Sequence, residues 1–144
     1  MAYADLKKAL PWLRGVRVHA ADAGREAEVR AALEAEGFLQ RTLEGSRIRG
    51  DASFFHEAER ALGFPEYFGH NWDAFNDCLG DVVFGPAERI AILWRDADRS
   101  LAADAQTVLD ATSAFDAVGS PGSEDEDPAQ LEVFLFGSGP GFGP

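Results

Sequence analysis

Residues 89–94 read Arg-Ile-Ala-Ile-Leu-Trp, a short and continuous apolar run that decides the fold class. A β-strand that is buried on both faces has this composition, and such strands occur in parallel sheets. The run is too short to span a membrane, which takes about 18 uninterrupted apolar residues. It therefore predicts a central strand of an α/β domain.

Strand-like and helix-like segments alternate on both sides of this run. Apolar periodicity, with stops at glycine and proline, sets their expected limits. The expected strands are residues 15–20, 38–43, 89–94 and 131–136. The expected helices are residues 25–36, 54–62, 72–79 and 101–115, the last with Leu101, Ala105, Val108, Leu109, Thr112 and Phe115 inward. This alternation predicts a parallel sheet with helices packed on it.

Charge is distributed unevenly along the 144 residues, whose formal net charge is −12. Residues 1–38 carry equal numbers of basic and acidic side chains, so the whole deficit lies in residues 39–144. Such a body repels nucleic acid and anionic lipid and attracts basic partners. One cysteine, Cys78, and the lack of a secretory signal or an apolar span lead us to expect a cytoplasmic protein.

Residues 64–81 group the polar, acidic and aromatic side chains best suited to binding or catalysis. The segment reads Phe-Pro-Glu-Tyr-Phe-Gly-His-Asn-Trp-Asp-Ala-Phe-Asn-Asp-Cys-Leu-Gly-Asp. Asn71 is the expected N-cap of the helix that follows. Asp73 and Asp77 are four apart, so both carboxylates project from one helix face, with Asn76 at its flank. An aromatic pair before Gly69 indicates a shaped loop. The residues alone leave two interpretations open, a binding patch or a solvated helix end.

This segment resembles the barstar family, the intracellular inhibitors of barnase-type ribonucleases. The matching pattern is Pro65-Glu66-Tyr67-Phe68-Gly69, then Asn71, then Asp73-Ala74-Phe75-Asn76-Asp77, and the resemblance extends over about residues 39–136. It implies a barstar fold with three core strands in a parallel sheet packed with helices. We expect residues 1–38 to form an N-terminal β-α extension on that core and residues 137–144 to be a disordered tail.

The resemblance also implies a function. Asp73 and Asp77 would face the basic groups that hold RNA phosphate in a guanyl-specific microbial ribonuclease, and Tyr67 would cover its catalytic histidine. The protein would be a monomer that forms a 1:1 complex with the enzyme and catalyses no reaction. It would bind neither nucleic acid nor membrane. The implied partner-binding residues are Tyr67, Phe68, Gly69, Asn71, Trp72, Asp73, Asn76, Asp77, Gly80 and Asp81.

Several positions depart from the family pattern. Asn76 stands where the family has an exposed tryptophan, which suggests a different cognate enzyme, and His70 replaces an acidic residue. A further acidic contact has two candidates, Asp110 and Asp116. Whether the acidic stretch at 124–127 joins the contact is left open.

Two other functions remain as alternatives. An acidic interaction module without a ribonuclease partner is one. An acid–base hydrolase using His70, Asp73 and Asp77 is the other, and it would need those carboxylates in a concave site. No cofactor is expected, and no metal ligand, because His56 and the nearby Glu57 and Glu59 have no second histidine at metal spacing. No catalytic residue is expected either, because neither a nucleophile nor a phosphate-binding loop accompanies His70 and Asp73.

Overall fold

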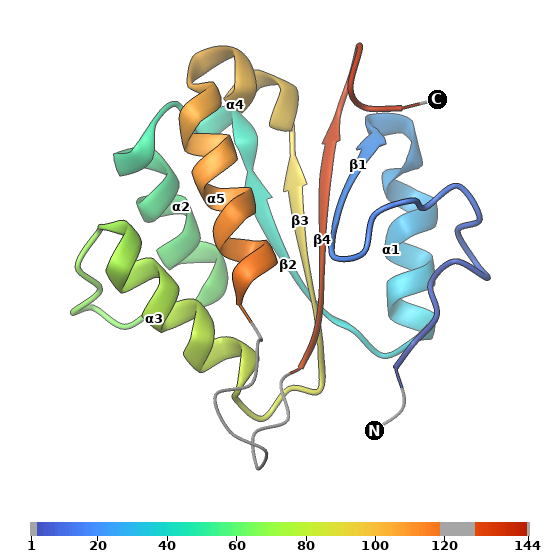
Figure 1. Ribbon diagram of the computed structural model, residues 1–144, viewed down its shortest axis with the longest axis horizontal. Coiled ribbons are helices and arrows are strands. Elements are labelled where there is room, and N and C mark those ends of the chain that lie inside the picture. The colour runs from blue at the N-terminus through green and yellow to red at the C-terminus, as the bar shows by residue number, and fades with distance from the viewer. Residues whose placement is uncertain (1–2, 119–128, 144) are drawn as a thin grey trace.

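The computed structural model describes residues 3–118 and 129–143, and within them four parallel strands lie between two layers of helices (Figure 1). The sheet order is β1-β4-β3-β2. The strands are β1 (Val18–Asp22), β2 (Leu39–Glu44), β3 (Arg89–Arg95) and β4 (Gln130–Gly137). The helices are α1 (Glu26–Ala35), α2 (Asp51–Leu62), α3 (Trp72–Val83), α4 (Ala97–Ala103) and α5 (Ala105–Ala117), with 3-10 turns η1 (Ala23–Arg25) and η2 (Gly45–Arg47). The predicted α/β class is confirmed.

The two central strands carry the pattern that predicted them. The interior of β3 is fully buried, and β4 is buried from its second residue onward. They pair in parallel with Ile92 opposite Val133. The outer strands are more accessible: β1 has two buried residues, His19 and Ala21, and β2 has one, Leu43.

One face of the sheet packs against α2, α3 and α5 (Figure 1). Trp94 and Ile92 of β3 meet Phe54 of α2, Phe75 of α3 and Phe115 of α5 in a core rich in aromatic rings. Within it, the Phe54 ring lies 5.2 Å from Phe75 and 5.5 Å from Trp94. We call this the aromatic face of the sheet.

The other face packs against α1 and the segment before β1. Leu93 of β3 and Phe134 of β4 point to this side and meet Leu33 of α1 and Leu10 of the N-terminal segment. The first 38 residues therefore add strand β1 and a helix that buries the second side of the sheet. We call this the N-terminal face.

Helix boundaries differ from the expected ones at three places. The helix predicted over 101–115 is two helices, because Asp104 is extended (φ −159°) and caps α5 through a bond from the Thr107 amide. The buried face of α5 is formed by Thr107, Val108, Ala111 and Phe115, so Leu109 (56% exposed) and Ala105, both expected inward, lie on its outer side. Helix α2 begins three residues earlier than expected, and α3 continues through Gly80 to Val83.

The chain end also differs from the expected disordered tail. Gly137 is the last residue of β4, and Phe142 folds back into the aromatic core with 5% exposure. The buried Phe142 ring anchors the glycine-rich segment 137–143 to the aromatic core. The acidic stretch at 124–127 lies outside the described residues. In the part of the chain that the structure describes, no helix has the length and apolar character to cross a bilayer.

Candidate functional site

Asn71 begins α3 as predicted. Its Oδ1 accepts the backbone N–H of Ala74 at 2.8 Å, which satisfies one of the free amides of the first turn. Its Nδ2 donates to the carbonyl of Gly69 at 3.1 Å. One side chain thus fixes both the start of the helix and the end of the loop before it.

Trp72 attaches the start of α3 to two other helices. Its ring stacks on Phe54 at 5.4 Å and meets Phe55 edge-on at 4.8 Å. Its Nε1 donates to Asp51 Oδ2 at 3.2 Å, and Asp51 Oδ1 accepts the Thr107 hydroxyl of α5 at 2.7 Å. Asp51 therefore joins α2, α3 and α5 at one point.

The loop before α3 presents its two aromatic residues in opposite ways. Phe68 is buried and packs edge-on against Phe55 and Phe64. Tyr67 beside it is 86% exposed. The Phe68 side chain thus supports the loop, while the Tyr67 ring is presented to solvent.

The outer face of α3 is a row of carboxylates. Asp73, Asp77 and Asp81 are spaced four apart and all are exposed, while Phe75 and Leu79 on the inner face are fully buried. Among residues 3–118 and 129–143, none of the three aspartates forms an ion pair. The row is thus a concentrated negative charge without an ion-pair partner in the described part of the chain.

Cys78 lies on the inner side of this helix. Burial raises the pKa of its thiol, and the carboxylates of Asp81 and Asp77 raise it further. A thiol with a raised pKa is a poor nucleophile. This agrees with a packing role for the cysteine.

A groove between α3 and α5 adjoins the acidic row. Its volume is about 570 Å³. It is lined by Trp72, Asn76, Asp110, Ser113, Ala114, Ala117 and Val118. Asp110 lies in it, whereas the backbone carbonyl of Asp116 accepts a bond from Arg17 at 3.0 Å. Sequence reasoning did not anticipate the groove, because it depends on how two distant helices pack.

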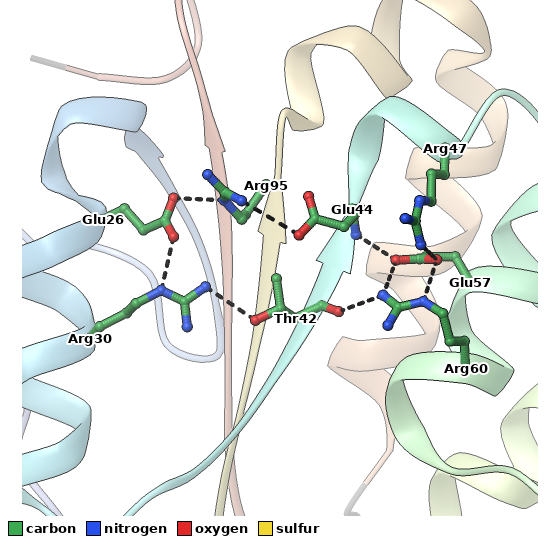
Figure 2. A network of polar contacts seen from close by, with 8 residues as sticks. All are labelled: Glu26, Arg30, Thr42, Glu44, Arg47, Glu57, Arg60 and Arg95. Carbon is green, nitrogen blue, oxygen red and sulfur yellow. Dashed lines mark hydrogen bonds and ion pairs between the residues drawn. The ribbon is translucent and has the colours of Figure 1, made fainter.

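A polar network behind the site holds α2 to the sheet (Figure 2). Glu57 is 3% exposed, accepts the Glu44 amide of β2 at 2.7 Å and pairs with Arg60. Burial tends to raise the pKa of Glu57, but the bonds from Arg60 and the Glu44 amide outweigh it, so the pKa of this carboxyl is lowered. The network fixes the helix on which α3 rests.

The network continues to the N-terminal face. Arg95 of β3 donates to Glu26 of α1 at 3.1 Å and to Glu44 at 3.5 Å. Arg30 of α1 donates to Glu26 and to the Thr42 hydroxyl. Figure 2 shows this chain of contacts passing from α1 across the sheet to α2.

The ten residues expected to bind a partner fall into three groups. Tyr67, Gly69, Asn71, Asp73, Asn76, Asp77 and Asp81 are exposed, Trp72 and Gly80 are half-buried, and Phe68 is buried. The His70–Asp73 pair that a hydrolase would use is not seen, since the His70 ring instead pairs with Glu59 at 3.0 Å. The groove lining includes neither Asp73 nor Asp77.

Comparison with known proteins bears on the same segment. A family model described as Barstar (barnase inhibitor) matches residues 38–134, which include β2, β3, the first five residues of β4, the acidic row and the groove. A search of curated proteins gave no match. Because the model spans well over half of the chain, the protein belongs to the barstar family of barnase inhibitors.

Proposed function

We propose that this chain inhibits a basic, guanyl-specific ribonuclease by placing α3 and its preceding loop in the active site of the enzyme. The observation that carries the proposal is the row of Asp73, Asp77 and Asp81, exposed and without ion-pair partners among the described residues. A cleft that binds RNA must hold phosphates with cationic side chains. Carboxylates accept the same charge-assisted bonds from arginine that phosphates do.

The loop completes the contact surface. Exposed Tyr67 presents its ring to the catalytic histidine of the enzyme. Buried Phe68 packs against Phe55 and holds the loop against α2. Gly69 lets the partner approach the backbone, since no side chain extends from it. Asn71 fixes the angle between loop and helix through its two hydrogen bonds. No bond is broken or formed, so inhibition is stoichiometric, one monomer to one enzyme molecule.

The groove determines which ribonuclease the protein recognises. Where the barstar family has an exposed tryptophan, this chain has Asn76 at the edge of a largely apolar hollow that also contains Asp110. A protruding cationic or aromatic side chain of the cognate enzyme fits this lining, because Asp110 supplies charge and Ala114 and Val118 supply apolar contact. Asn76→Trp would fill the hollow, so we expect weaker binding to the cognate enzyme. An unchanged affinity of Asn76→Trp for the enzyme would show that the groove lies outside the contact.

The direct test is a titration of barnase-type ribonucleases with the purified protein, monitored by RNA cleavage. We expect full inhibition at a 1:1 ratio by at least one such enzyme. Asp77→Ala should weaken binding by about 3–5 kcal/mol, more than a hundredfold in Kd, because it leaves buried cations of the enzyme unpaired. Glu34→Ala is the matched control, since Glu34 is an exposed carboxylate on α1, across the sheet.

The charge of the protein supplies a second measurement. Association should slow as ionic strength rises, because screening over about 8 Å at 0.15 M salt weakens long-range attraction between an acidic and a basic protein. The barnase–barstar pair is itself the standard illustration of this steering. An association rate that ignores salt would contradict the proposed electrostatics.

The remaining alternative is an acidic interaction module with another partner, in the same cytoplasmic location that we propose for the inhibitor. The replacement of the family tryptophan by Asn76 is the observation that favours it. Failure to inhibit any barnase-type ribonuclease would support this alternative over the inhibitor.

A further inference from the structure

Two histidines and a glutamate meet beside the loop that carries Tyr67. They are His56 and Glu59 of α2 and His70 of the loop, and one ligand atom from each lies within 4.8 Å of the other two. His70 Nε2 is 3.0 Å from Glu59 Oε2, and the two imidazole rings are 4.6 Å apart and nearly perpendicular. The spacing of His56, Glu57 and Glu59 along the chain shows no second histidine, because His70 joins this cluster only through the tertiary fold.

Local structure holds these side chains together. His56 and Glu59 are three apart in α2, so they share one face of the helix. His70 has φ of +50°, the left-handed region that residues with a Cβ adopt uncommonly. The Phe68 ring, fixed in the core, lies 5.0 Å from the His70 ring. This backbone conformation, supported by a buried anchor two residues earlier, directs His70 back toward α2.

The donor set has the chemistry of a transition-metal site. Two imidazoles and one carboxylate are a known three-ligand set for Zn²⁺, with bonds of about 2.0–2.2 Å and a fourth position left for water. Ligand atoms around a tetrahedral ion of that size stand about 3.4 Å apart. His70 and Glu59 are already at 3.0 Å. The remaining ligand, His56, is exposed, so a small rotation of its side chain can bring its nitrogen closer.

We propose that His56, Glu59 and His70 bind a divalent transition-metal ion of the zinc type. The ion would add coordinate bonds between the loop before α3 and α2, which the His70–Glu59 pair and the packing of Phe68 on Phe55 already join. Because His70 lies between Gly69 and Asn71, the bound ion fixes the loop that presents Tyr67. This last consequence rests on the proposed function, whereas metal binding itself does not.

The test is calorimetric titration of zinc chloride into the full chain in a non-chelating buffer, with magnesium chloride as the comparison ion. We expect one zinc site per chain and no magnesium site, because Mg²⁺ prefers all-oxygen ligands. His56→Gln and His70→Gln should each abolish the zinc site. Glu66→Gln, an exposed carboxylate in the same loop, should leave it intact. Failure of the wild type to bind zinc, or full binding by both histidine variants, would overturn the proposal.

Two further readouts identify the ligands and separate binding from folding. The chain has three histidines. In NMR spectra, zinc should shift the ring signals of His56 and His70 and leave those of His19, buried on the N-terminal face, unchanged. Thermal unfolding without zinc checks that the variants fold, and zinc should raise the Tm of the wild type but of neither histidine variant.

A ribonuclease arm then measures the consequence for the loop. If the chain inhibits a ribonuclease, adding zinc to the metal-free protein should tighten inhibition by the wild type and not by His70→Gln. If no ribonuclease is inhibited, the calorimetric result still decides the metal site. The two proposals therefore fail independently.

Discussion

The two faces of the sheet are built differently. The aromatic face packs rings from α2, α3 and α5 into one continuous core. The N-terminal face packs mainly aliphatic side chains and includes a buried polar pair, His19 of β1 and Glu132 of β4, 2.8 Å apart. The barstar family match begins at residue 38, where the chain that buries the N-terminal face ends. The family domain thus carries the candidate site, and residues before it bury the sheet's other side.

Removal of residues 1–37 is the most severe test of the difference between the two faces. It exposes Leu93, Phe134 and Phe136, which are buried on the N-terminal face, and leaves β4 without its β1 partner. Because an exposed apolar face and a long unpaired edge strand promote aggregation, we expect loss of soluble monomer. Size-exclusion chromatography and circular dichroism check this. A monomeric, cooperatively folded fragment would show that the family domain is self-sufficient.

Single core truncations compare the two faces directly. Phe75→Ala on the aromatic face should lower the free energy of unfolding by about 3–5 kcal/mol, and Leu33→Ala on the N-terminal face by about 2–5 kcal/mol. Both side chains have no exposed surface. Chemical denaturation measures both. Because Phe75 lies under the acidic row and Leu33 does not, only the first should also weaken ribonuclease binding.

The polar network that joins the two faces predicts a dependence on pH. The folded pKa of Glu57 is below its usual 4.5, so its contribution to stability is present above that pH and is lost as pH falls through the folded pKa. Glu57→Gln should cost about 1.5–3 kcal/mol at neutral pH, since bonds to a charged group are lost. The difference from wild type should shrink in acid. A difference that is constant down to pH 3 would contradict this.

The buried pair on the N-terminal face gives the smallest expected effect. Glu132→Leu leaves His19 Nε2 without its partner and should cost about 1–3 kcal/mol. Glu132→Gln keeps an acceptor oxygen at nearly the same place and should cost less. Thermal unfolding of the two variants separates the hydrogen bond from simple packing. Equal losses would show that the pair contributes through shape alone.

Local signals in the sequence predicted the elements that depend on near neighbours. The apolar run at residues 89–94 marked β3, and Asn71 marked the start of α3. The four-residue spacing of Asp73 and Asp77 placed both on one exposed face, as the structure has them. These features need only the geometry of one strand or one helix.

Features that depend on tertiary packing were missed. The apolar spacing of residues 101–115 hid the break at Asp104, which follows from the extended backbone of that residue. The burial of Phe142 and the groove beside Asn76 need contacts between distant segments. The meeting of His56 with His70 needs a positive φ that no spacing rule shows.

The pairing of β1 with β4 has a consequence for how the chain folds during synthesis. Val18 lies opposite Val133, so the first strand of the sheet finds its partner only after more than a hundred further residues have been made. Contacts of such long range slow folding, because the loop between them must be closed first. Strand β1 can therefore pair only after β4 has left the ribosome. Its polar residues His19 and Asp22 limit the apolar surface that it exposes until then.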